Sequence, residues 1–309
     1  PSSVARLVEI AKVQSVESSN RIEGIVTTKA RIRSLVADKA TPRNRDEEEI
    51  MGYRDVLNTV HENYEYIDLT RHIVLQLHRD LYAYSHKGIG GQFKNVQNSI
   101  IERLADGSEV ERFRPLAPYE TPAAIDDICH SINAVLQDKS VDPLLVIPVF
   151  IHDFLCIHPF NDGNGRMSRL LTTLLLYQNG YMIGKFISLE QKIERTKDSY
   201  YAALAQSGAG WHTGDEDIVP FVKYMLRVIL AAYRDFESRI ELLTMSLSAK
   251  DRIKIIISAT IGKITKSGIL EKQPDIAVST VEKALKELVE EGFIERHGVG
   301  RSTFYVKVS

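Results

Sequence analysis

The chain has 309 residues, 44% of them hydrophobic and 26% charged, and it carries a formal net charge of −2. This length suits two domains with a large apolar core, and the near-neutral charge gives no global indication of a nucleic-acid or membrane-surface protein. Because no apolar run reaches the ~20 residues of a spanning helix, and the first residues, PSSVARLVEIA, lack a secretory pattern, we expect a cytoplasmic protein without a membrane segment.

Helical patterns dominate the first 245 residues. Apolar residues spaced three and four apart predict helices over Glu47–Tyr64, Thr70–Tyr84, Thr121–Asp138 and Asp142–His158. The last of these is apolar nearly all round, so we expect it to be the buried central helix. Further helices are predicted over residues 166–178, 199–207 and 217–243. Cys129 and Cys156 lie outside any C-x-x-C pair, so we expect free, buried thiols.

One segment, residues 91–118, breaks the helical pattern. Its centre, Ala105-Asp106-Gly107-Ser108, is typical of a hairpin turn, and short strand-like runs flank it. A lone hairpin is marginally stable, so we expect this one to serve a function on a helical domain.

The composition changes near Ser246. From Ala249 to Ser309 the chain holds 11 Lys and Arg against 8 Asp and Glu. Two helical patterns are followed by the strand-like runs FIERH and STFYVKV, separated by a GVG turn, which is the order of a winged helix-turn-helix. Ser279 and Glu282 predict a capping box at the start of the second helix. We therefore expect a helical domain over 1–245 and a small winged helix-turn-helix domain over 246–309.

A polar stretch, HPFNDGNGRMSRLL, follows the predicted central helix. Gly163, Asn164 and Gly165 form a turn that leads into the next helix, where unpaired backbone N–H groups and the positive end of the helix dipole favour an anion. Arg166 and Arg169 are three residues apart and share one helix face. Two guanidinium groups over an amide cradle suit a di- or triphosphate.

Two more residues of this stretch add chemistry to the predicted anion site. Asp162 is a suitable Mg²⁺ ligand, because Mg²⁺ usually takes one carboxylate together with phosphate oxygens. His158 can accept a proton at neutral pH. Each residue alone has a structural explanation, such as a turn or a solvated helix face. In this order, at one loop-to-helix junction, they indicate a phosphate site with a base beside it.

Residues His158 to Arg169 resemble the Fic-family signature, H-x-F-x-[DE]-G-N-G-R-x-x-R, and match it at every specified position. The resemblance extends from about Ser15 to Arg239, and the 91–118 hairpin resembles the family's target-binding flap. It implies a mainly α fold, consisting of a Fic-type helical domain with a β-hairpin flap. It also implies a protein adenylyltransferase that transfers AMP from ATP to a Ser, Thr or Tyr hydroxyl of a target protein, releases pyrophosphate and uses Mg²⁺.

The resemblance also implies roles for individual residues. His158 would deprotonate the target hydroxyl, and Asp162 would hold Mg²⁺. The α- and β-phosphates would be cradled by Gly163, Asn164, Gly165 and Arg166. Arg169 would bind the γ-phosphate. Tyr200 and Tyr201 are candidates for the base pocket, and core packing explains them equally well.

A second stretch, SSNRIEGI, can also be interpreted through this resemblance. Ser19 and Glu23 are four residues apart, so they share a face if the segment is helical. An ordinary surface helix with an exposed glutamate is one interpretation. The segment also resembles the family's inhibitory helix, [ST]-x-x-x-E-[GN], here at about residues 15–27. That resemblance implies that Glu23 pairs with Arg169 and blocks the γ-phosphate site.

Two alternative functions remain open from the sequence. The first is a DNA-binding transcriptional regulator in which the Fic part is a sensor. The same segment, residues 246–309, could instead bind a partner protein. Candidate DNA-contacting residues are Thr280, Lys283, Lys286, Arg296, His297 and Arg301. Acidic neighbours oppose this assignment: Glu282, Glu287, Glu290 and Glu291. The second alternative keeps the fold with another nucleotide or a phosphocholine carrier as donor, although the arginine pair favours a nucleoside triphosphate.

Overall fold

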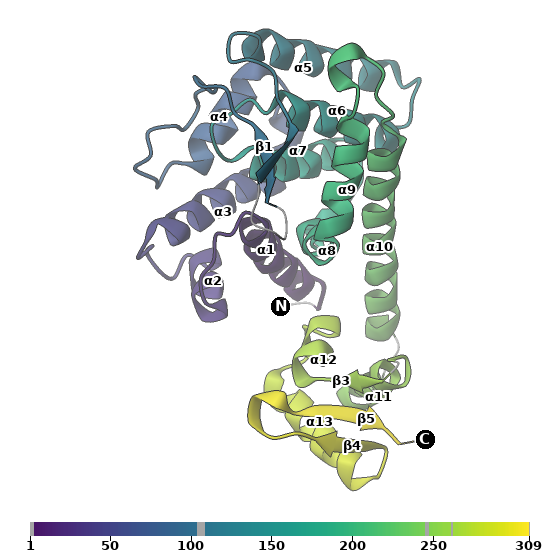
Figure 1. Ribbon diagram of the computed structural model, residues 1–309. Coiled ribbons are helices and arrows are strands. Elements are labelled where there is room, and N and C mark those ends of the chain that lie inside the picture. The colour runs from purple at the N-terminus through teal and green to yellow at the C-terminus, as the bar shows by residue number, and fades with distance from the viewer. Residues whose placement is uncertain (1–2, 104–108, 245–246, 261, 309) are drawn as a thin grey trace. The chain divides into compact units, whose positions relative to one another are not determined.

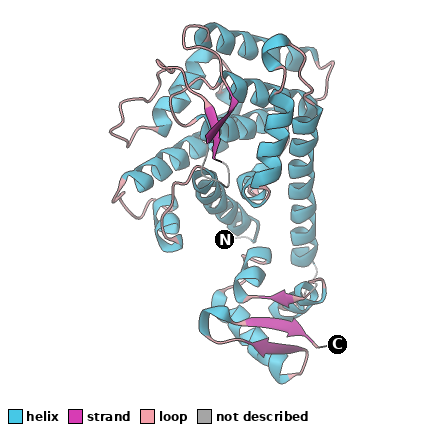
Figure 2. Ribbon diagram, in the orientation of Figure 1, coloured by secondary structure: helices cyan, strands magenta, loops and turns pink. Residues whose placement is uncertain are grey.

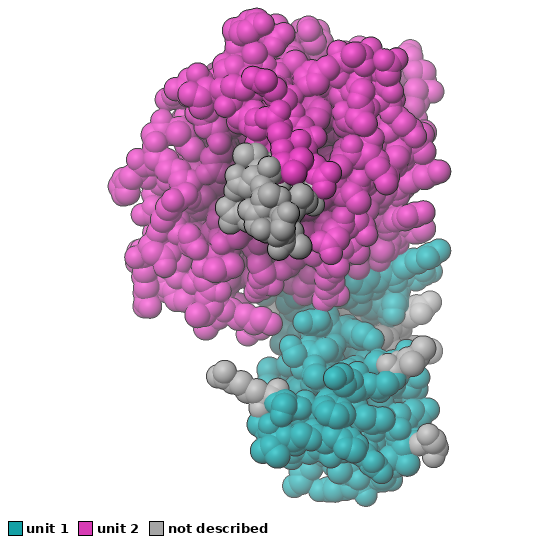
Figure 3. Space-filling view, viewed as in Figure 1, with its two compact units in different colours: residues 1–10, 233–309 teal, residues 11–232 magenta. Residues whose placement is uncertain are grey.

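The computed structural model describes residues 3–103, 109–244, 247–260 and 262–308. Helices make up most of this part of the chain, which confirms the mainly α class (Figure 2). Two compact units are present, one of residues 11–232 and one of residues 1–10 together with 233–309 (Figure 3). The unit boundary at 232/233 lies inside helix α10 (Val219–Thr244), thirteen residues before the domain boundary that we expected, and helix α1 (Ser3–Ile22) contributes to both units.

The unit of residues 11–232 is a helical assembly. Its other helices are α2 (Lys29–Val36), α3 (Arg45–Asn63), α4 (Arg71–Leu81), α5 (Thr121–Asp138), α6 (Pro143–Ile157), α7 (Asn164–Gln178), α8 (Leu189–Arg195) and α9 (Lys197–Gly208). Helix α6 packs between α5 and α7, and α7 also packs on α3 (Figure 1). Thirteen of the fifteen residues of α7 and nine of the fifteen of α6 are buried, whereas Leu145 and Val149 on α6 are exposed. Helix α6 is therefore central over its second half, and the prediction of a helix buried nearly all round is only partly correct. Both cysteines are free and buried as expected, Cys129 in α5 and Cys156 in α6.

Local sequence explains where the central helices begin and end. The Asp142 side chain accepts a hydrogen bond from the backbone N–H of Leu144, and Pro143 follows at the first helical position. Helix α6 ends where His158 adopts a left-handed conformation, with φ 51° and ψ 62°. Gly163 also has positive φ, 88°, which favours glycine, and α7 begins at the next residue. The two left-handed residues bracket the polar loop.

The predicted hairpin is present as two short antiparallel strands, β1 (Ile100–Arg103) and β2 (Glu109–Phe113). Ile100 pairs with Phe113, and Arg103 pairs with Glu109. The expected turn, Ala105-Asp106-Gly107-Ser108, lies outside the described residues. The Phe113 ring stacks on His212, with ring centroids 5.4 Å apart, which ties the base of the hairpin to the helical unit.

The elements after α10 form a small helix-and-sheet structure. They are α11 (Ala249–Ser258), β3 (Lys263–Ile264), α12 (Lys266–Lys272), α13 (Val278–Glu290), β4 (Ile294–His297) and β5 (Phe304–Lys307). The strands form an antiparallel sheet in the order β3-β5-β4. The capping box predicted from Ser279 and Glu282 is wrong, because α13 begins at Val278 after Ala277, without a side-chain cap. Glu282 instead pairs with Lys266, at 2.6 Å.

The described part of the chain contains no helix that is both long and apolar enough to cross a membrane.

Candidate functional site

His158 lies at the junction between α6 and the polar loop. Its Nδ1 is 3.2 Å from the carbonyl oxygen of Leu155. A carbonyl oxygen only accepts hydrogen bonds, so Nδ1 carries the proton and Nε2 is the basic nitrogen. Burial, with a smaller contribution from the charge of Lys94, lowers the pKa of His158 to about 4. The imidazole is therefore neutral at pH 7, which is the state that a general base requires.

Asn164 and Phe160 hold the polar loop in shape. The Asn164 side chain accepts a hydrogen bond from the Phe160 N–H at 2.9 Å and donates one to the Phe160 carbonyl oxygen at 2.7 Å. The Phe160 ring is fully buried and stacks on His78, with ring centroids 3.6 Å apart. Because both polar atoms of the Asn164 amide are used within the loop, its contribution to an anion site is its backbone.

The segment before β1 also holds the polar loop in shape. From the sequence, this segment was expected only to belong to the hairpin. The buried Lys94 donates from Nζ to the Ile157 carbonyl oxygen and from its backbone N–H to the Pro159 carbonyl oxygen, each at 2.8 Å. Asn98 donates to the Phe160 carbonyl oxygen at 3.1 Å. Burial lowers the pKa of Lys94 to about 8. These residues fix the backbone on both sides of His158.

The start of α7 leaves little room for side chains. A Cβ on Gly165 would lie 2.2 Å from Oε1 of Glu23, and a Cβ on Gly163 would lie 3.0 Å from the Tyr82 ring. Gly163 therefore needs glycine, because its positive φ and the Tyr82 ring both disfavour a side chain, whereas at Gly165 the tip of the Glu23 side chain would have to shift. The first turn of α7 presents backbone N–H groups at the end of the loop.

Arg166 is the strongest indication of an anionic ligand. Its guanidinium is buried, and Nη2 contacts the Tyr82 hydroxyl at 2.7 Å and Glu49 at 2.8 Å. Nε and Nη1 are also buried, and neither has a hydrogen-bond partner among the described residues. Leaving a buried donor unpaired costs about 1–3 kcal/mol. A phosphate oxygen would satisfy these donors, so the residues present fit a nucleotide phosphate.

Asp162 is half-exposed at the edge of this site. Its Oδ1 accepts the Gly163 N–H at 2.7 Å, and Oδ2 lies 2.6 Å from Nζ of Lys87. Burial raises the pKa of Asp162, but the Lys87 ammonium outweighs it and holds that pKa below its usual range. No group of three or more His, Cys, Asp and Glu side chains suited to a metal ion occurs among the described residues. Mg²⁺ held by a single carboxylate takes its remaining ligands from phosphate and water.

Arg169 is already occupied by the end of α1. Its Nε donates to the Ser19 hydroxyl at 2.7 Å, and its Nη2 donates to the Ser19 carbonyl oxygen at 2.9 Å and to Glu23 Oε1 at 2.7 Å. Ser19 and Arg169 are buried, and the Glu23 side chain is 32% exposed. The structure thus brings together three residues up to 150 positions apart in the chain.

Further contacts hold the end of α1, and none was predicted from the sequence. Lys197 donates from Nζ to the Ile22 carbonyl oxygen at 2.9 Å. Arg21 pairs with Glu194 at 3.0 Å. Lys197 begins α9, and Glu194 lies near the end of α8, so these two helices form a clasp around the segment that carries Glu23.

The two tyrosines considered for a base pocket differ. Tyr200 is buried and packs on Phe221 and Tyr224, with ring centroids 6.0 and 5.6 Å away. Tyr201 is 44% exposed. Core packing accounts for Tyr200, and Tyr201 alone is accessible to a ligand.

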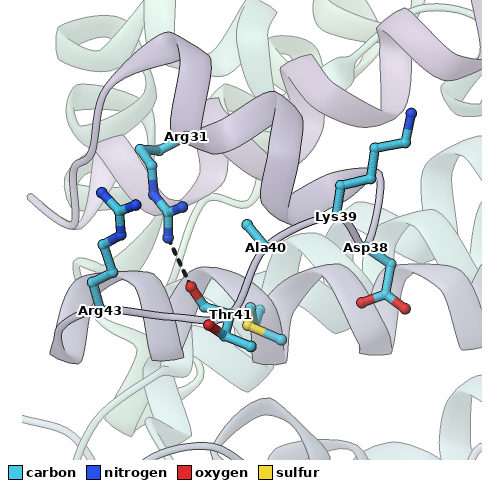
Figure 4. Close-up of a pocket in the computed structure, with 7 residues that line it drawn as sticks. Arg31, Asp38, Lys39, Ala40, Thr41 and Arg43 are labelled. Atoms are coloured by element: carbon cyan, nitrogen blue, oxygen red, sulfur yellow. Dashed lines mark hydrogen bonds between the residues drawn. The ribbon is translucent and has the colours of Figure 1, made fainter.

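A pocket of about 580 Å³ lies between α2 and the start of α3. It is lined by Arg31, Asp38, Lys39, Ala40, Thr41, Arg43 and Met51 (Figure 4). Arg31 donates to the Thr41 carbonyl oxygen at 2.7 Å and pairs with Glu47 at 2.5 Å. These partners join α2 to α3, so we assign this pocket a structural role.

Residues 68–176 match the model of the Fic/DOC family. This part of the chain is a Fic/DOC domain. The chain is 25% identical over 234 residues to a curated relative from Nematostella vectensis named protein adenylyltransferase Fic, a match that covers 72% of this chain and 48% of that protein. The chain thus spans about half the length of the curated relatives that it matches.

Solved structures share the fold. A Fic family protein from Desulfovibrio desulfuricans superposes with a TM-score of 0.63 at 20% identity and covers 98% of this chain and 88% of its own. A Fic domain-containing signalling protein from Bacteroides thetaiotaomicron has a TM-score of 0.61 at 25% identity, covering 75% of this chain and 89% of its own. The Fic domain of our chain includes the hairpin, the polar loop and most of α7, whereas Ser19 and Glu23 lie before it.

Proposed function

We propose that this protein transfers AMP from ATP to a Ser, Thr or Tyr hydroxyl of a target protein, with release of pyrophosphate. The observation that carries the proposal is the buried Arg166, which has two unpartnered guanidinium nitrogens and lies in the first turn of α7, directly after the loop that begins with His158. The name of the relatives, protein adenylyltransferase, supports the same reaction class. The arginine pair favours a nucleoside triphosphate over a phosphocholine carrier.

The proposed reaction uses the residues as follows. Nε2 of His158 takes the proton of the target hydroxyl, and the oxygen attacks the α-phosphorus. The bond between the α-phosphorus and the oxygen bridging to the β-phosphate breaks, and pyrophosphate leaves. The α- and β-phosphates bind to the backbone of residues 163–165 and to Arg166. Arg169 binds the γ-phosphate once its guanidinium is released from Ser19 and Glu23. Mg²⁺, when bound, would be held by Asp162 and would neutralise phosphate charge.

We also propose that the chain restrains itself. Glu23 and Ser19 use three donor contacts of Arg169, the same donors that a γ-phosphate requires. A charge-assisted Arg–carboxylate bond is stronger than a neutral one, so ATP must displace the segment before it binds productively. The wild-type chain is then a weak enzyme until the end of α1 moves.

The hairpin is the proposed target-binding flap. An extended segment of the target would add to β1 or β2 through backbone hydrogen bonds. Ile100→Pro removes the backbone N–H of the first residue of β1. We expect this variant to lose modification of a protein target while it keeps ATP binding in calorimetry, and equal target modification would reduce the hairpin to a structural cover.

We further propose that residues 246–309 form a winged helix-turn-helix domain, since three helices precede the β4-β5 hairpin. Its surface charges favour a protein partner over DNA. Lysines on and around α13 pair with acidic neighbours: Lys266 with Glu282, Lys250 with Glu287, Lys254 with Glu291 and Lys286 with Glu290. A gel shift of the full chain with a salt series tests the DNA alternative, because phosphate contacts give a steep salt dependence.

The free, buried cysteines support the proposal of a reducing, cytoplasmic location. The reaction itself is tested with labelled ATP, Mg²⁺ and a cell lysate, followed by mass spectrometry. Glu23→Gly is the activated form for this assay, and His158→Ala is its inactive control. Absence of a +AMP mass on any Ser, Thr or Tyr with Glu23→Gly would contradict the proposed function.

A further inference from the structure

Lys87 lies in the loop after α4 and contacts two carboxylates. Its Nζ is 2.6 Å from Oδ2 of Asp162 and 2.9 Å from Oε1 of Glu49. The Lys87 side chain is 20% exposed, and its ammonium also lies over the Tyr82 ring, 5.3 Å from the centroid. The ammonium is thus held from three sides at the edge of the phosphate site.

The two carboxylates differ in how firmly they are held. Glu49, from α3, is buried and also pairs with Arg166 at 2.8 Å and with Arg45 at 3.1 Å. The Asp162 side chain is 47% exposed, and its other oxygen accepts the Gly163 N–H. Glu49 is therefore a fixed acceptor, whereas Asp162 faces solvent, from which a metal ion would arrive.

A divalent cation and an ammonium cannot both occupy the same carboxylate oxygen, because like charges at such short range repel strongly. Asp162 is the residue that our proposed function gives to Mg²⁺, so the inference rests on that function. The ammonium of Lys87 stands where the charge of a metal ion would be. Lys87 retains Glu49 as a partner if it leaves Asp162.

We propose that Lys87 is an internal counter-ion of the metal site, which holds Asp162 in the resting protein and yields to Mg²⁺ by shifting fully onto Glu49. Mg²⁺ without nucleotide then competes with Lys87 and binds weakly. When Mg·ATP binds, phosphate oxygens supply further ligands to the metal ion. Lys87, now paired with Glu49 alone, keeps its positive charge close to the phosphates. Lys87 is a positioning residue for this site, and it takes no part in bond formation.

The test is binding of Mn²⁺ alone to the full chain, followed by electron paramagnetic resonance or calorimetry. Lys87→Gln should bind Mn²⁺ about 2- to 6-fold more tightly than wild type, the range expected for removal of a partly exposed ion pair. Lys87→Arg keeps the cation and should bind like wild type. Asp162→Asn should abolish the tight site of Lys87→Gln.

Arg45→Gln is the matched control, because it removes another cation from Glu49 without a contact to Asp162. An equal rise in Mn²⁺ affinity for Arg45→Gln and Lys87→Gln would indicate only a general change in charge and overturn the proposal. It is overturned as well if Lys87→Gln binds no more tightly than wild type, binds no Mn²⁺, or keeps its affinity after Asp162→Asn. Thermal unfolding of each variant verifies that it is folded.

This outcome is independent of the reaction. AMP transfer by Glu23→Gly with an unchanged Mn²⁺ affinity in Lys87→Gln would remove the counter-ion role and leave the proposed function intact. Tighter Mn²⁺ binding without any AMP transfer by Glu23→Gly would keep the counter-ion role and remove the proposed function.

Discussion

At the scale of single residues, burial has two effects on the site: it determines the charge state of His158, and it leaves two nitrogens of Arg166 without partners. His158 is neutral because its pKa falls to about 4, and its Nδ1 proton is committed to the Leu155 carbonyl. Arg166 is buried, and two of its guanidinium nitrogens have no hydrogen-bond partner among the described residues. A neutral base and a cation with spare donors are what nucleophile activation and phosphate binding require.

The first residue-scale prediction concerns the base. His158→Ala should lower AMP transfer by roughly 10²- to 10⁴-fold, because a general base typically contributes that much. ATP affinity should change little, since the loop backbone and Arg166 are unaffected. Transfer is measured in the Glu23→Gly background, and ATP binding by calorimetry. Near-normal transfer by the double variant would show that another group takes the proton.

The second residue-scale prediction concerns the restraint. Glu23→Gln should raise AMP incorporation about 5- to 30-fold, because it replaces a partly exposed charge-assisted bond, worth about 1–2 kcal/mol, by a weaker neutral one. Ser19→Ala should give a smaller rise, since Arg169 keeps two of its three contacts with the segment. Incorporation of labelled AMP at equal protein concentration is the measurement.

Glu23→Gly provides a second form of the same experiment, although glycine also loosens the helix end by up to about 1 kcal/mol. Glu9→Gln, which changes an exposed acidic residue near the start of α1, fourteen positions before Glu23, is the matched control. If Glu23→Gln and Glu23→Gly both equal wild type, the contact with Arg169 does not limit the reaction.

At the scale of elements, the restraint that we propose depends on where α1 ends. The clasp of α8 and α9 holds that end through Lys197 and Glu194, which contact the residues just before Glu23. The clasp and Arg169 therefore both hold the same short segment, residues 19–23. Neither Lys197 nor Glu194 lies in the polar loop, and both are outside the residues that match the Fic/DOC family.

An element-scale prediction follows from this clasp. Lys197→Met should raise AMP incorporation about 2- to 5-fold, because it removes a hydrogen bond to the Ile22 carbonyl oxygen that is worth about 0.5–1 kcal/mol. Combined with Glu23→Gly, it should have no further effect, since the restraint is already gone. Lys223→Met, which changes an exposed lysine of α10, is the control. A fall in activity of Lys197→Met in both backgrounds would place Lys197 in substrate binding instead.

The elements also show which local signals were sufficient. The helices around the polar loop were predicted within a few residues because their caps and stops, such as Pro143 and Gly163, are local. The capping box at Ser279 failed because α13 starts one residue earlier, at Val278. A capping motif in sequence does not specify which residue enters the helix first when neighbouring residues also accept helical geometry.

At the scale of the whole molecule, buried histidines couple stability to pH. Burial lowers the pKa values of His61, His78 and His158 to about 4. In the unfolded chain these imidazoles titrate near 6.5. Between about pH 6.5 and 4 the unfolded state thus binds more protons than the folded state, so acid favours unfolding in this window.

We expect the free energy of unfolding to fall by a few kcal/mol from pH 7.5 to pH 5, and to change little from these groups above pH 7. Urea unfolding at a series of pH values measures the slope. His61→Gln should flatten the slope without affecting the site, because His61 contacts Tyr177 in the last turn of α7, at the opposite end of this helix from the polar loop. A slope that is unchanged in His61→Gln, or a stability that rises toward pH 5, would contradict this assignment.

The sequence by itself determined the helical class, the hairpin strands, the buried α6–α7 pair and the polar loop with its signature. These depend on periodicity, caps and glycines within a few residues of each other, which act locally. Its resemblance to a family also indicated that Glu23 and Arg169 act together, although no local pattern relates positions 146 apart.

The side chains that surround the polar loop could be identified only from the tertiary structure. Lys94 became a clamp on the loop, Glu49 a partner of Arg166, and Lys87 a counter-ion of Asp162. Each of these contacts joins residues 63 or more positions apart, and its formation depends on how α3, α4 and α7 pack. No local sequence pattern distinguishes such a lysine in a loop or such a glutamate in a helix from other charged residues. Their burial and charge pairing arise only when the chain folds around them.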